Sequence, residues 1–211
     1  MGRPGRNVIN IITRQFFVAA FAIFLGSCAA PRDTEHHIVV SVHDQQLALL
    51  EKGNLVATYP ISTSKFGLGD RPGSFGTPLG ELEIADKIGD GAPAGTVFKD
   101  RRRTGELVAV NAPGRDPIVT RIIWLRGKEG RNANAYGRDI YIHGTPEERN
   151  IGRPASYGCI RMRSVDIINL YGQVGPGAEV SIINPPLTSV IPALTSGTQM
   201  AESNHAIGVI R

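Results

Sequence analysis

The stretch that decides the fold is HIVVSVHDQQLALLE, residues 37–51. Its two apolar halves flank the polar triplet His43-Asp44-Gln45. Short apolar runs on either side of a polar turn are typical of a β-hairpin. Lys52-Gly53-Asn54 makes a second turn before another apolar run, residues 55–59. The sequence therefore predicts three successive strands that are joined by tight turns.

Runs of the same kind recur downstream, and we expect further strands at residues 82–84, 118–125, 139–143 and 178–183. The loops between them carry much of the 25 Gly and 14 Pro, a composition that argues against a helical bundle or coiled coil. With 41% hydrophobic and 20% charged residues, the chain is not disordered throughout. The predicted fold class is mainly β and mostly antiparallel.

Helix is expected at two places only. Ser164 is a suitable N-cap for a helix with apolar Val165, Ile168 and Tyr171 at helical spacing, and Gly175 ends it. A shorter helical turn is expected after Thr145-Pro146, with Thr145 as its cap. The prediction is therefore one or two short helices in the β domain.

The formal net charge of +4 does not indicate a nucleic-acid partner. Three of the basic residues, Arg3, Arg6 and Arg14, lie in the first 27 residues, where there is no acid, and the remainder is nearly balanced. A nucleic-acid interface needs a net basic face. The run Arg101-Arg102-Arg103 is expected to be a solvated loop.

The N-terminal segment has the features of an export signal. Its arginines precede an apolar run of about ten residues, 16–25, which is too short to span a bilayer as a permanent helix. The following Leu25-Gly26-Ser27-Cys28 resembles the lipobox of bacterial lipoproteins. The resemblance implies that Cys28 is lipidated and is the first residue of the mature chain. It also implies an exported protein, lipid-anchored at the cell envelope in the periplasm or on the outer face of the membrane.

The expected organisation therefore has four parts. Residues 1–27 are a signal peptide, and residues 28–36 are a polar tether that carries the lipidated Cys28. Residues 37–184 form the β domain. Residues 185–211 contain several Pro, Ser and Thr residues and are expected to be a mobile tail.

A lipidated Cys28 leaves Cys159 as a free thiol, because the chain has only these two cysteines. A free cysteine is often a small buried apolar residue, but the residues around this one favour a reactive group. His143 ends a predicted strand, and an imidazole can take the proton of a thiol to give a thiolate and an imidazolium. Gly158 allows a tight turn, so the amides of Gly158 and Cys159 are candidate oxyanion donors.

These residues form a pattern that resembles the signature of bacterial L,D-transpeptidases with the YkuD-type catalytic domain. The pattern is His143-Gly144-Thr145 followed by Ser156-x-Gly158-Cys159-Ile160-Arg161. Residues 59–64 and the turn Thr77-Pro78-Leu79-Gly80 also resemble that family. The resemblance covers most of residues 37–184 and implies a β-sandwich that carries the cysteine in a groove.

The resemblance also implies a role for each matching residue. Cys159 is the nucleophile, His143 is the general base and acid, and the backbone carbonyl of Gly144 orients the imidazole. Ser156 has two possible roles, bracing the loop or assisting the imidazole. Arg161 also has two, binding a substrate carboxylate or tying down the loop. Tyr157 stands where the family usually has His, and we expect it to contact substrate.

The implied reaction is acyl transfer on peptidoglycan stem peptides. The Cys159 thiolate attacks the carbonyl of the third residue of a tetrapeptide stem, D-Ala leaves, and the thioester is passed to an amine acceptor. The product is a 3-3 cross-link or an attached protein. The route needs no cofactor. No metal is expected either, because His36, His37 and His43 lack acidic or cysteine partners at ligand spacing and are expected to be surface histidines.

Several alternatives remain open. Water could take the acyl group in place of an amine, which would make the chain an L,D-carboxypeptidase or hydrolase. The domain could instead be a catalytically silent wall-binding module with a structural Cys159.

Two other classes of cysteine enzyme fit the sequence less well. A sortase also uses His, Cys and Arg, but its Arg follows the Cys at a longer interval. Papain-like wall peptidases place the Cys before the His, the reverse of the order found here.

Overall fold

The computed structural model describes residue 2 and residues 31–194 of the 211-residue chain. Apart from residue 2, the predicted signal peptide lies outside the described residues, as do the lipobox with Cys28 and the end of the predicted tail, residues 195–211. Within residues 31–194, no helix has the length and apolar character needed to cross a membrane.

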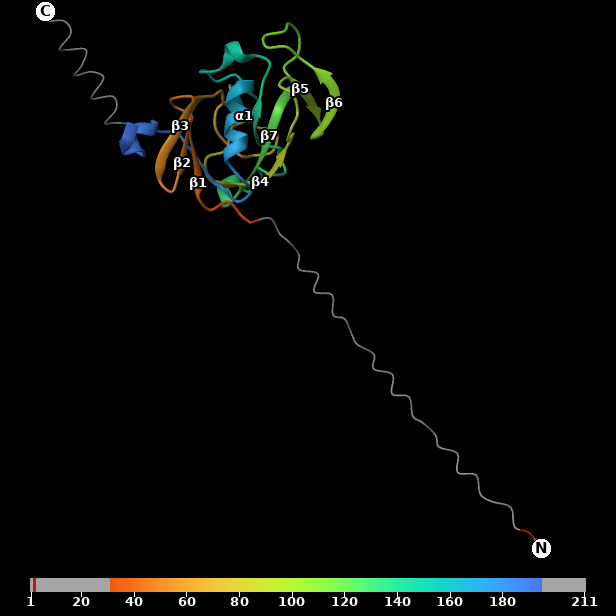
Figure 1. The fold of residues 1–211 in the computed structure, drawn as a ribbon. Coiled ribbons are helices and arrows are strands. Elements are labelled where there is room, and N and C mark those ends of the chain that lie inside the picture. Colours follow the sequence, from red (N-terminus) through yellow and green to blue (C-terminus); the bar gives the residue numbers. More distant parts are fainter. Residues whose placement is uncertain (1, 3–30, 195–211) are drawn as a thin grey trace, which may run out of the picture. The chain divides into compact units, whose positions relative to one another are not determined.

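The described residues form one mixed sheet with few short helices (Figure 1). Its ten strands are β1 His36–Ser41, β2 Gln46–Glu51, β3 Asn54–Pro60, β4 Gly80–Ile88, β5 Thr96–Lys99, β6 Arg102–Leu107, β7 Ile118–Gly127, β8 Tyr141–Gly144, β9 Ile160–Met162 and β10 Glu179–Ile183. They lie in the order β3-β2-β1-β10-β4-β7-β5-β6, and β8 pairs with both β7 and β9. The mainly β fold class is confirmed.

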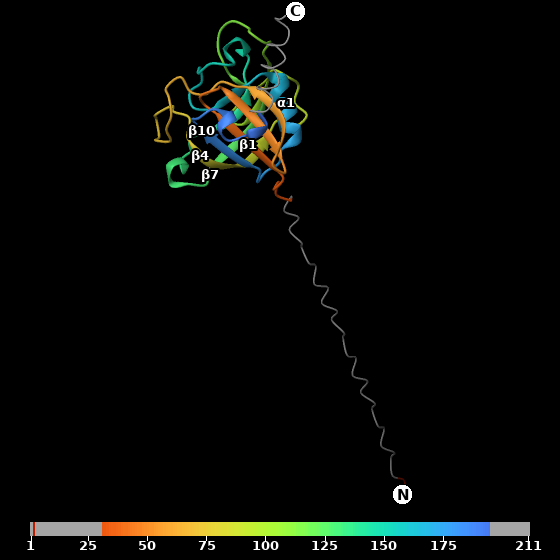
Figure 2. The same cartoon turned by 90° about the vertical axis from the view of Figure 1, so that its left-hand side faces the viewer.

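The first hairpin lies inside the protein, which explains its apolar sequence. Ile38 and Leu47 belong to the main core, whereas Val39 and Ala48 face a second apolar cluster on the opposite side of the sheet. A strand buried on both faces has a continuous apolar sequence rather than an alternating one. β1 pairs with β2 on one edge and, in parallel, with β10 on the other, so it is an interior strand (Figure 2).

β7 joins the two parts of the sheet. It pairs with β4 along one edge and with β8 along the other, while its first residues also pair with β5. Its register against β8 shifts between Val119 and Ile122, and Thr120 in this bulge has φ 73°. Bulges bend strands and are frequent next to active sites. This one lies beside the end of β8, where the sequence predicts catalytic residues.

The predicted helix is present as α1, Ser164–Gln173, but its cap and its buried face differ from the prediction. Ser164 is the first helical residue, and its hydroxyl bonds to Thr120 Oγ1 instead of capping the helix. Val165 is 68% exposed and Ile168 37% exposed. Tyr171 is buried as predicted, but its partners on the face packed against the sheet are Ile167 and Leu170.

Three 3-10 helices complete the described fold: η1 Gly130–Asn132, η2 Glu148–Asn150 and η3 Leu187–Ser189. η2 is the short turn that was expected after Thr145-Pro146, but its N-cap is Glu147 and not Thr145. η3 contradicts part of the predicted tail, because Leu187 is 1% and Ile191 4% exposed where they pack on Val39 and Ala48. Residues 185–194 therefore belong to the domain, held there by apolar burial that their Pro and Ser content does not reveal.

Candidate active site

The strand pair β8–β9 brings the predicted catalytic residues together. The two strands are parallel, with His143 opposite Arg161. Cys159 directly precedes β9 and lies two residues from Arg161, so its side chain is directed to the same face. His143, Cys159 and Arg161 line one pocket of about 190 Å³, together with Asp116, Ile118, Ser156 and Tyr157.

The imidazole of His143 is held by the backbone. His143 is 5% exposed, and its Nδ1 lies 2.8 Å from the carbonyl oxygen of Gly144. A carbonyl oxygen only accepts, so Nδ1 carries the proton and Nε2 is left as the proton acceptor. Burial lowers the pKa of His143 to about 4. The histidine is therefore a neutral base at physiological pH, with its tautomer set by Gly144.

Gly144 has a steric reason to be glycine. A Cβ atom at this position would lie 2.6 Å from the backbone oxygen of Val119 in the bulged part of β7. Real Cβ contacts are not that short, so a side chain would push β8 away from β7. The same close approach helps to hold the Gly144 carbonyl where it accepts the hydrogen bond of His143 Nδ1.

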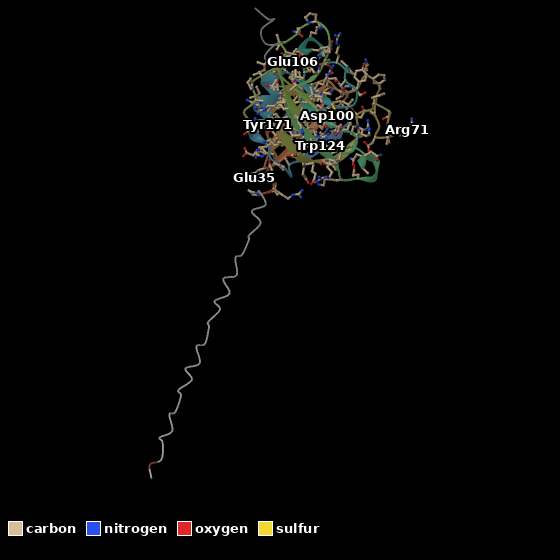
Figure 3. All side chains as sticks on the ribbon, turned by 90° about the vertical axis from the view of Figure 1, so that its right-hand side faces the viewer. Glu35, Arg71, Asp100, Glu106, Trp124 and Tyr171 are labelled. Atoms are coloured by element: carbon tan, nitrogen blue, oxygen red, sulfur yellow. The ribbon has the colours of Figure 1, made fainter. Side chains whose placement is uncertain are left out.

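The thiol of Cys159 borders two pockets. It is partly exposed, donates to the carbonyl of Asp139 at 3.3 Å and accepts from the Tyr141 amide at 3.4 Å. Burial raises the pKa of the Cys159 thiol to about 11. Cys159 also lines a second pocket of about 220 Å³, together with Phe98, Asp100, Arg101, Ile118, Ile122, Asp139 and Tyr141 (Asp100 is labelled in Figure 3).

The two pKa shifts have opposite directions, but both keep their side chain uncharged near neutral pH. A lowered pKa keeps His143 neutral, and a raised pKa keeps Cys159 protonated. The resting site therefore holds a thiol and a neutral imidazole, and not the thiolate–imidazolium pair that the sequence suggested. In residues 31–194, the hydrogen bonds of the thiol go to Asp139 and Tyr141.

The rate of Cys159 acylation is expected to stay level from about pH 5 to pH 9 and to fall only around pH 4. This follows from the predicted role of His143 as base: protonation would end that role, and the lowered pKa of His143 places its protonation at about pH 4. The measurement is kcat/KM for acylation across a pH series, with circular dichroism to check folding at each pH. An acidic limb centred near pH 6.5, the ordinary value for histidine, would contradict this assignment.

The loop before Cys159 is braced from within. The Ser156 hydroxyl donates to the Cys159 carbonyl at 2.6 Å and accepts from the Gly158 amide at 3.2 Å. The Gly158 amide is thus engaged by Ser156, which is at odds with its predicted use as an oxyanion donor. The Cys159 amide remains as the candidate donor. Gly158 has φ 123°, a backbone conformation that favours glycine.

The upstream motifs clamp this loop from outside. Ser62 and Arg161 exchange two backbone hydrogen bonds, and the Thr63 carbonyl accepts from the Ser156 amide at 2.9 Å. The Thr77 hydroxyl donates to the Gly158 carbonyl at 3.0 Å. The upstream segments that resemble the family, residues 59–64 and 77–80, therefore support the loop that precedes Cys159.

Tyr157 lies at the mouth of the pocket within an exposed aromatic cluster. Its ring centroid is 5.2 Å from that of Phe66 and 5.9 Å from that of Phe75, and all three rings are more than half exposed. The Lys65 ammonium lies 4.3 Å from the Tyr157 ring centroid. A cluster of exposed aromatic rings beside a pocket is a candidate contact surface.

Arg161 has a partner that the sequence analysis did not single out. Its Nη1 donates to Asp116, whose other oxygen accepts a hydrogen bond from Thr145 at 2.5 Å. Asp116 comes from the loop before β7, outside every recognised motif, so nothing in the sequence pointed to it. Burial lowers the pKa of Arg161.

The three histidines near β1 do not converge on one site. His36 pairs with Asp33, His37 bonds to Ser181 and His43 pairs with Asp44. His43 is exposed, whereas His36 and His37 are partly buried. Across residues 31–194, no group of three or more His, Cys, Asp or Glu is arranged to hold a metal ion.

Comparisons with known proteins agree with the predicted family. Residues 35–182 match the family model of the L,D-transpeptidase catalytic domain (YkuD). Two curated relatives come from Escherichia coli strain K12. "Probable L,D-transpeptidase YcfS" is 32% identical over 182 residues, covering 84% of this chain and 52% of the relative. "Probable L,D-transpeptidase YbiS" is 30% identical over 158 residues, covering 74% of this chain and 47% of the relative.

The chain thus spans about half the length of these relatives. Among solved structures, L,D-transpeptidase 3 from Mycobacterium tuberculosis in complex with a faropenem-derived adduct aligns with a TM-score of 0.45 at 17% identity, covering 70% of this chain and 60% of that one. The family model covers well over half of the chain, and the resemblance inferred from the motifs is confirmed. The protein belongs to the L,D-transpeptidase catalytic domain (YkuD) family.

Proposed function

We propose that this chain is a peptidoglycan L,D-transpeptidase with Cys159 as nucleophile and His143 as general base and acid. One observation carries the proposal: a free thiol and a neutral imidazole oriented by Gly144 open into the same pocket. A neutral pair is competent because the base accepts the thiol proton as the sulfur attacks.

The first step forms a thioester. His143 Nε2 takes the proton of the Cys159 thiol, and the sulfur attacks the carbonyl of the third residue in a tetrapeptide stem. The Cys159 amide stabilises the oxyanion of the tetrahedral intermediate. The C–N bond then breaks, and the D-Ala amine leaves with the proton that His143 carried. The acyl group remains on Cys159.

The second step uses an amine acceptor. The acceptor amine attacks the thioester carbonyl, gives its proton to His143, and the Cys159 thiolate leaves and is reprotonated. The second pocket that Cys159 lines supports a reaction with two substrates. Its lining includes the acidic side chains of Asp100 and Asp139, of which Asp139 is paired with Arg101 at 2.8 Å.

The proposed product is a 3-3 cross-link or an attached protein. The alternatives are hydrolysis of the same thioester, which makes an L,D-carboxypeptidase, and a catalytically silent wall-binding module. Purified protein incubated with a defined tetrapeptide stem separates the three by mass spectrometry. Transpeptidation yields stem dimers, hydrolysis yields only tripeptide and D-Ala, and a silent module leaves Cys159 unacylated.

We also propose that Tyr157, with Phe66 and Phe75, contacts the substrate where it leaves the pocket. The cluster is exposed and adjoins the pocket through Tyr157 itself. Aromatic rings offer a large contact surface at low conformational cost. Lys65 adds a positive charge at the same place.

The location proposed for the protein is the cell envelope, with Cys28 as lipid anchor. The support is the sequence Leu25-Gly26-Ser27-Cys28 after an apolar run. Cys28→Ser is expected to release the protein from the membrane fraction of expressing cells, because the acyl chains supply its membrane affinity. Fractionation and immunoblotting measure this. Unchanged membrane retention would count against the lipid anchor.

A further inference from the structure

A buried ion pair outside the pocket of Cys159 and His143 joins two loops. Arg138 Nη1 lies 2.9 Å from Asp70 Oδ1, and the two side chains are 10% and 5% exposed. Asp70 is turned inward, whereas Arg71, the next residue, lies at the outer edge of the domain (Figure 3). A buried ion pair adds little net stability, because the removal of both charges from water offsets their attraction. The other contacts of this pair indicate a role in positioning.

The Arg138 guanidinium closes the loop that begins at Gly69 and ends at Gly76. Besides its bond to Asp70, Nη1 donates to the carbonyl oxygen of Gly69 at 3.0 Å, and Nη2 donates to that of Gly76 at 2.8 Å. Asn134 adds two hydrogen bonds to Asp70, one to its carboxylate at 2.6 Å and one to its carbonyl oxygen at 3.2 Å. Because one rigid planar group binds the first and the last residue of the loop, the separation of the two ends is fixed.

The same guanidinium lies against the loop that precedes Cys159. A Cβ atom on Gly158 would lie 3.6 Å from Arg138 Nη2 and 3.3 Å from the carbonyl oxygen of Gly76. Asp139, the residue after Arg138, accepts the hydrogen bond of the Cys159 thiol. Arg138 therefore connects the loop that it closes with the segments that hold the proposed nucleophile.

The loop closed by Arg138 carries part of the exposed aromatic cluster. Phe75 directly precedes Gly76, and its ring centroid is 5.6 Å from that of Phe66. Both rings contact Tyr157, yet each is about half exposed, so few neighbouring side chains hold them. Their position depends on the backbone that carries them, and Arg138 is what ties that backbone to the domain.

We propose that the Asp70–Arg138 pair positions Phe66 and Phe75 beside Tyr157 before the acyl donor binds. This inference rests on the proposed function, in which the three rings contact the donor. A contact surface that is already ordered loses less conformational entropy on binding, so it binds more tightly. Asp70 and Arg138 are positioning residues, because they act through the rings and do not meet the substrate.

The test compares a reaction that uses the aromatic cluster with one that does not. The first is acylation of Cys159 by a tetrapeptide stem, measured as kcat and KM, and the second is alkylation of Cys159 by iodoacetamide. Both are followed by mass spectrometry of the full chain. Arg138→Gln is expected to raise KM for the stem by about 5- to 150-fold, the range for the ordering of two side chains. The value of kcat and the alkylation rate are expected to stay close to those of the wild type, which is the pattern for a loss of binding alone.

Two further variants assign the effect to this pair. Asp70→Asn keeps the size of the side chain and leaves Arg138 its two carbonyl partners, and it is expected to raise KM in the same direction. Arg32→Gln is the matched control, since it removes an exposed arginine that pairs with Glu83, and it is expected to change neither reaction. An unchanged KM in either folded variant of the pair overturns the inference. A parallel loss of acylation and alkylation also overturns it, because the pair would then serve the Cys159 loop and not the rings.

Hydrogen exchange of the wild type gives a reading that needs no variant. Residues 66–76 are expected to be as well protected before the stem binds as afterwards, because the pair orders them in the free protein. Protection gained only on binding would overturn the inference even if both variants of the pair failed to fold. A wild type that iodoacetamide alkylates at Cys159 but no stem acylates would instead contradict the proposed function.

Discussion

Cys159→Ala is expected to abolish the formation of cross-linked products from tetrapeptide stems, with a rate loss of about 10⁴-fold or more. The proposed reaction passes through a thioester on this sulfur, so no covalent route remains without it. The fold is expected to persist, because the side chain is small and partly exposed at the edge of two pockets. The measurement combines product analysis by mass spectrometry with thermal unfolding of the variant.

Cys28→Ser is the matched control, since it removes the other cysteine of the chain. It is expected to retain full activity on soluble stems, because its proposed role is attachment and not chemistry. A carbapenem should form a stable adduct with the wild type and with Cys28→Ser and none with Cys159→Ala. Substantial cross-linking by folded Cys159→Ala would remove Cys159 from the mechanism and favour a structural role for this cysteine.

Much of the fold was predictable because its signals are local. The hairpin at residues 37–51 combines short apolar runs with a polar turn, and β2 has the expected bounds. By contrast, β6 is exposed along its whole length and β9 has three residues, so neither shows a hydrophobic pattern. These strands exist because neighbouring strands offer backbone partners, which a linear sequence does not display.

The errors on α1 and on the end of the domain have the same origin. Val165 and Ile168 have helical spacing, but so do Ile167, Leu170 and Tyr171, and only the direction of approach to the sheet selects the buried set. Leu187 and Ile191 stand among residues typical of a tail, yet an apolar face of the first hairpin is open to them. Tertiary packing decides both cases.

The candidate site likewise has features that the sequence predicted and features that only the structure shows. His143, Gly144, Ser156 and Cys159 were singled out because their motif is compact in sequence, and the structure brings them to one pocket wall or its supporting loop. Asp116 was missed because an isolated acid in a loop has no recognisable pattern. The protonation states also required structure, since the pKa values of His143 and Cys159 depend on burial. The sequence indicated the two groups that we propose as the reacting ones, but not their resting charges.

The uncharged resting state of His143 and Cys159 determines how the loss of His143, the proposed base, should affect the rate of acylation. His143→Ala is expected to lower acylation at pH 7 by about 10²- to 10⁴-fold, the usual contribution of a general base. Without an acceptor for its proton, the thiol reacts only through its ionised fraction. Because burial raises the pKa of Cys159 to about 11, that fraction is very small at neutral pH. The rate of the variant should then rise about tenfold per pH unit toward alkaline pH, where the wild type stays level.

The pH profile makes this prediction specific to a base, since a misfolded or merely loosened pocket would lower the rate without producing such a slope. His43→Ala is the matched control: His43 is exposed and pairs with Asp44 outside the pocket, and its loss should leave both rate and profile unchanged. Acylation of Cys159 is measured by mass from pH 6 to pH 10 in wild type and both variants. A flat profile with a near wild-type rate in His143→Ala would show that another group removes the thiol proton, and His143 would lose its place in the mechanism.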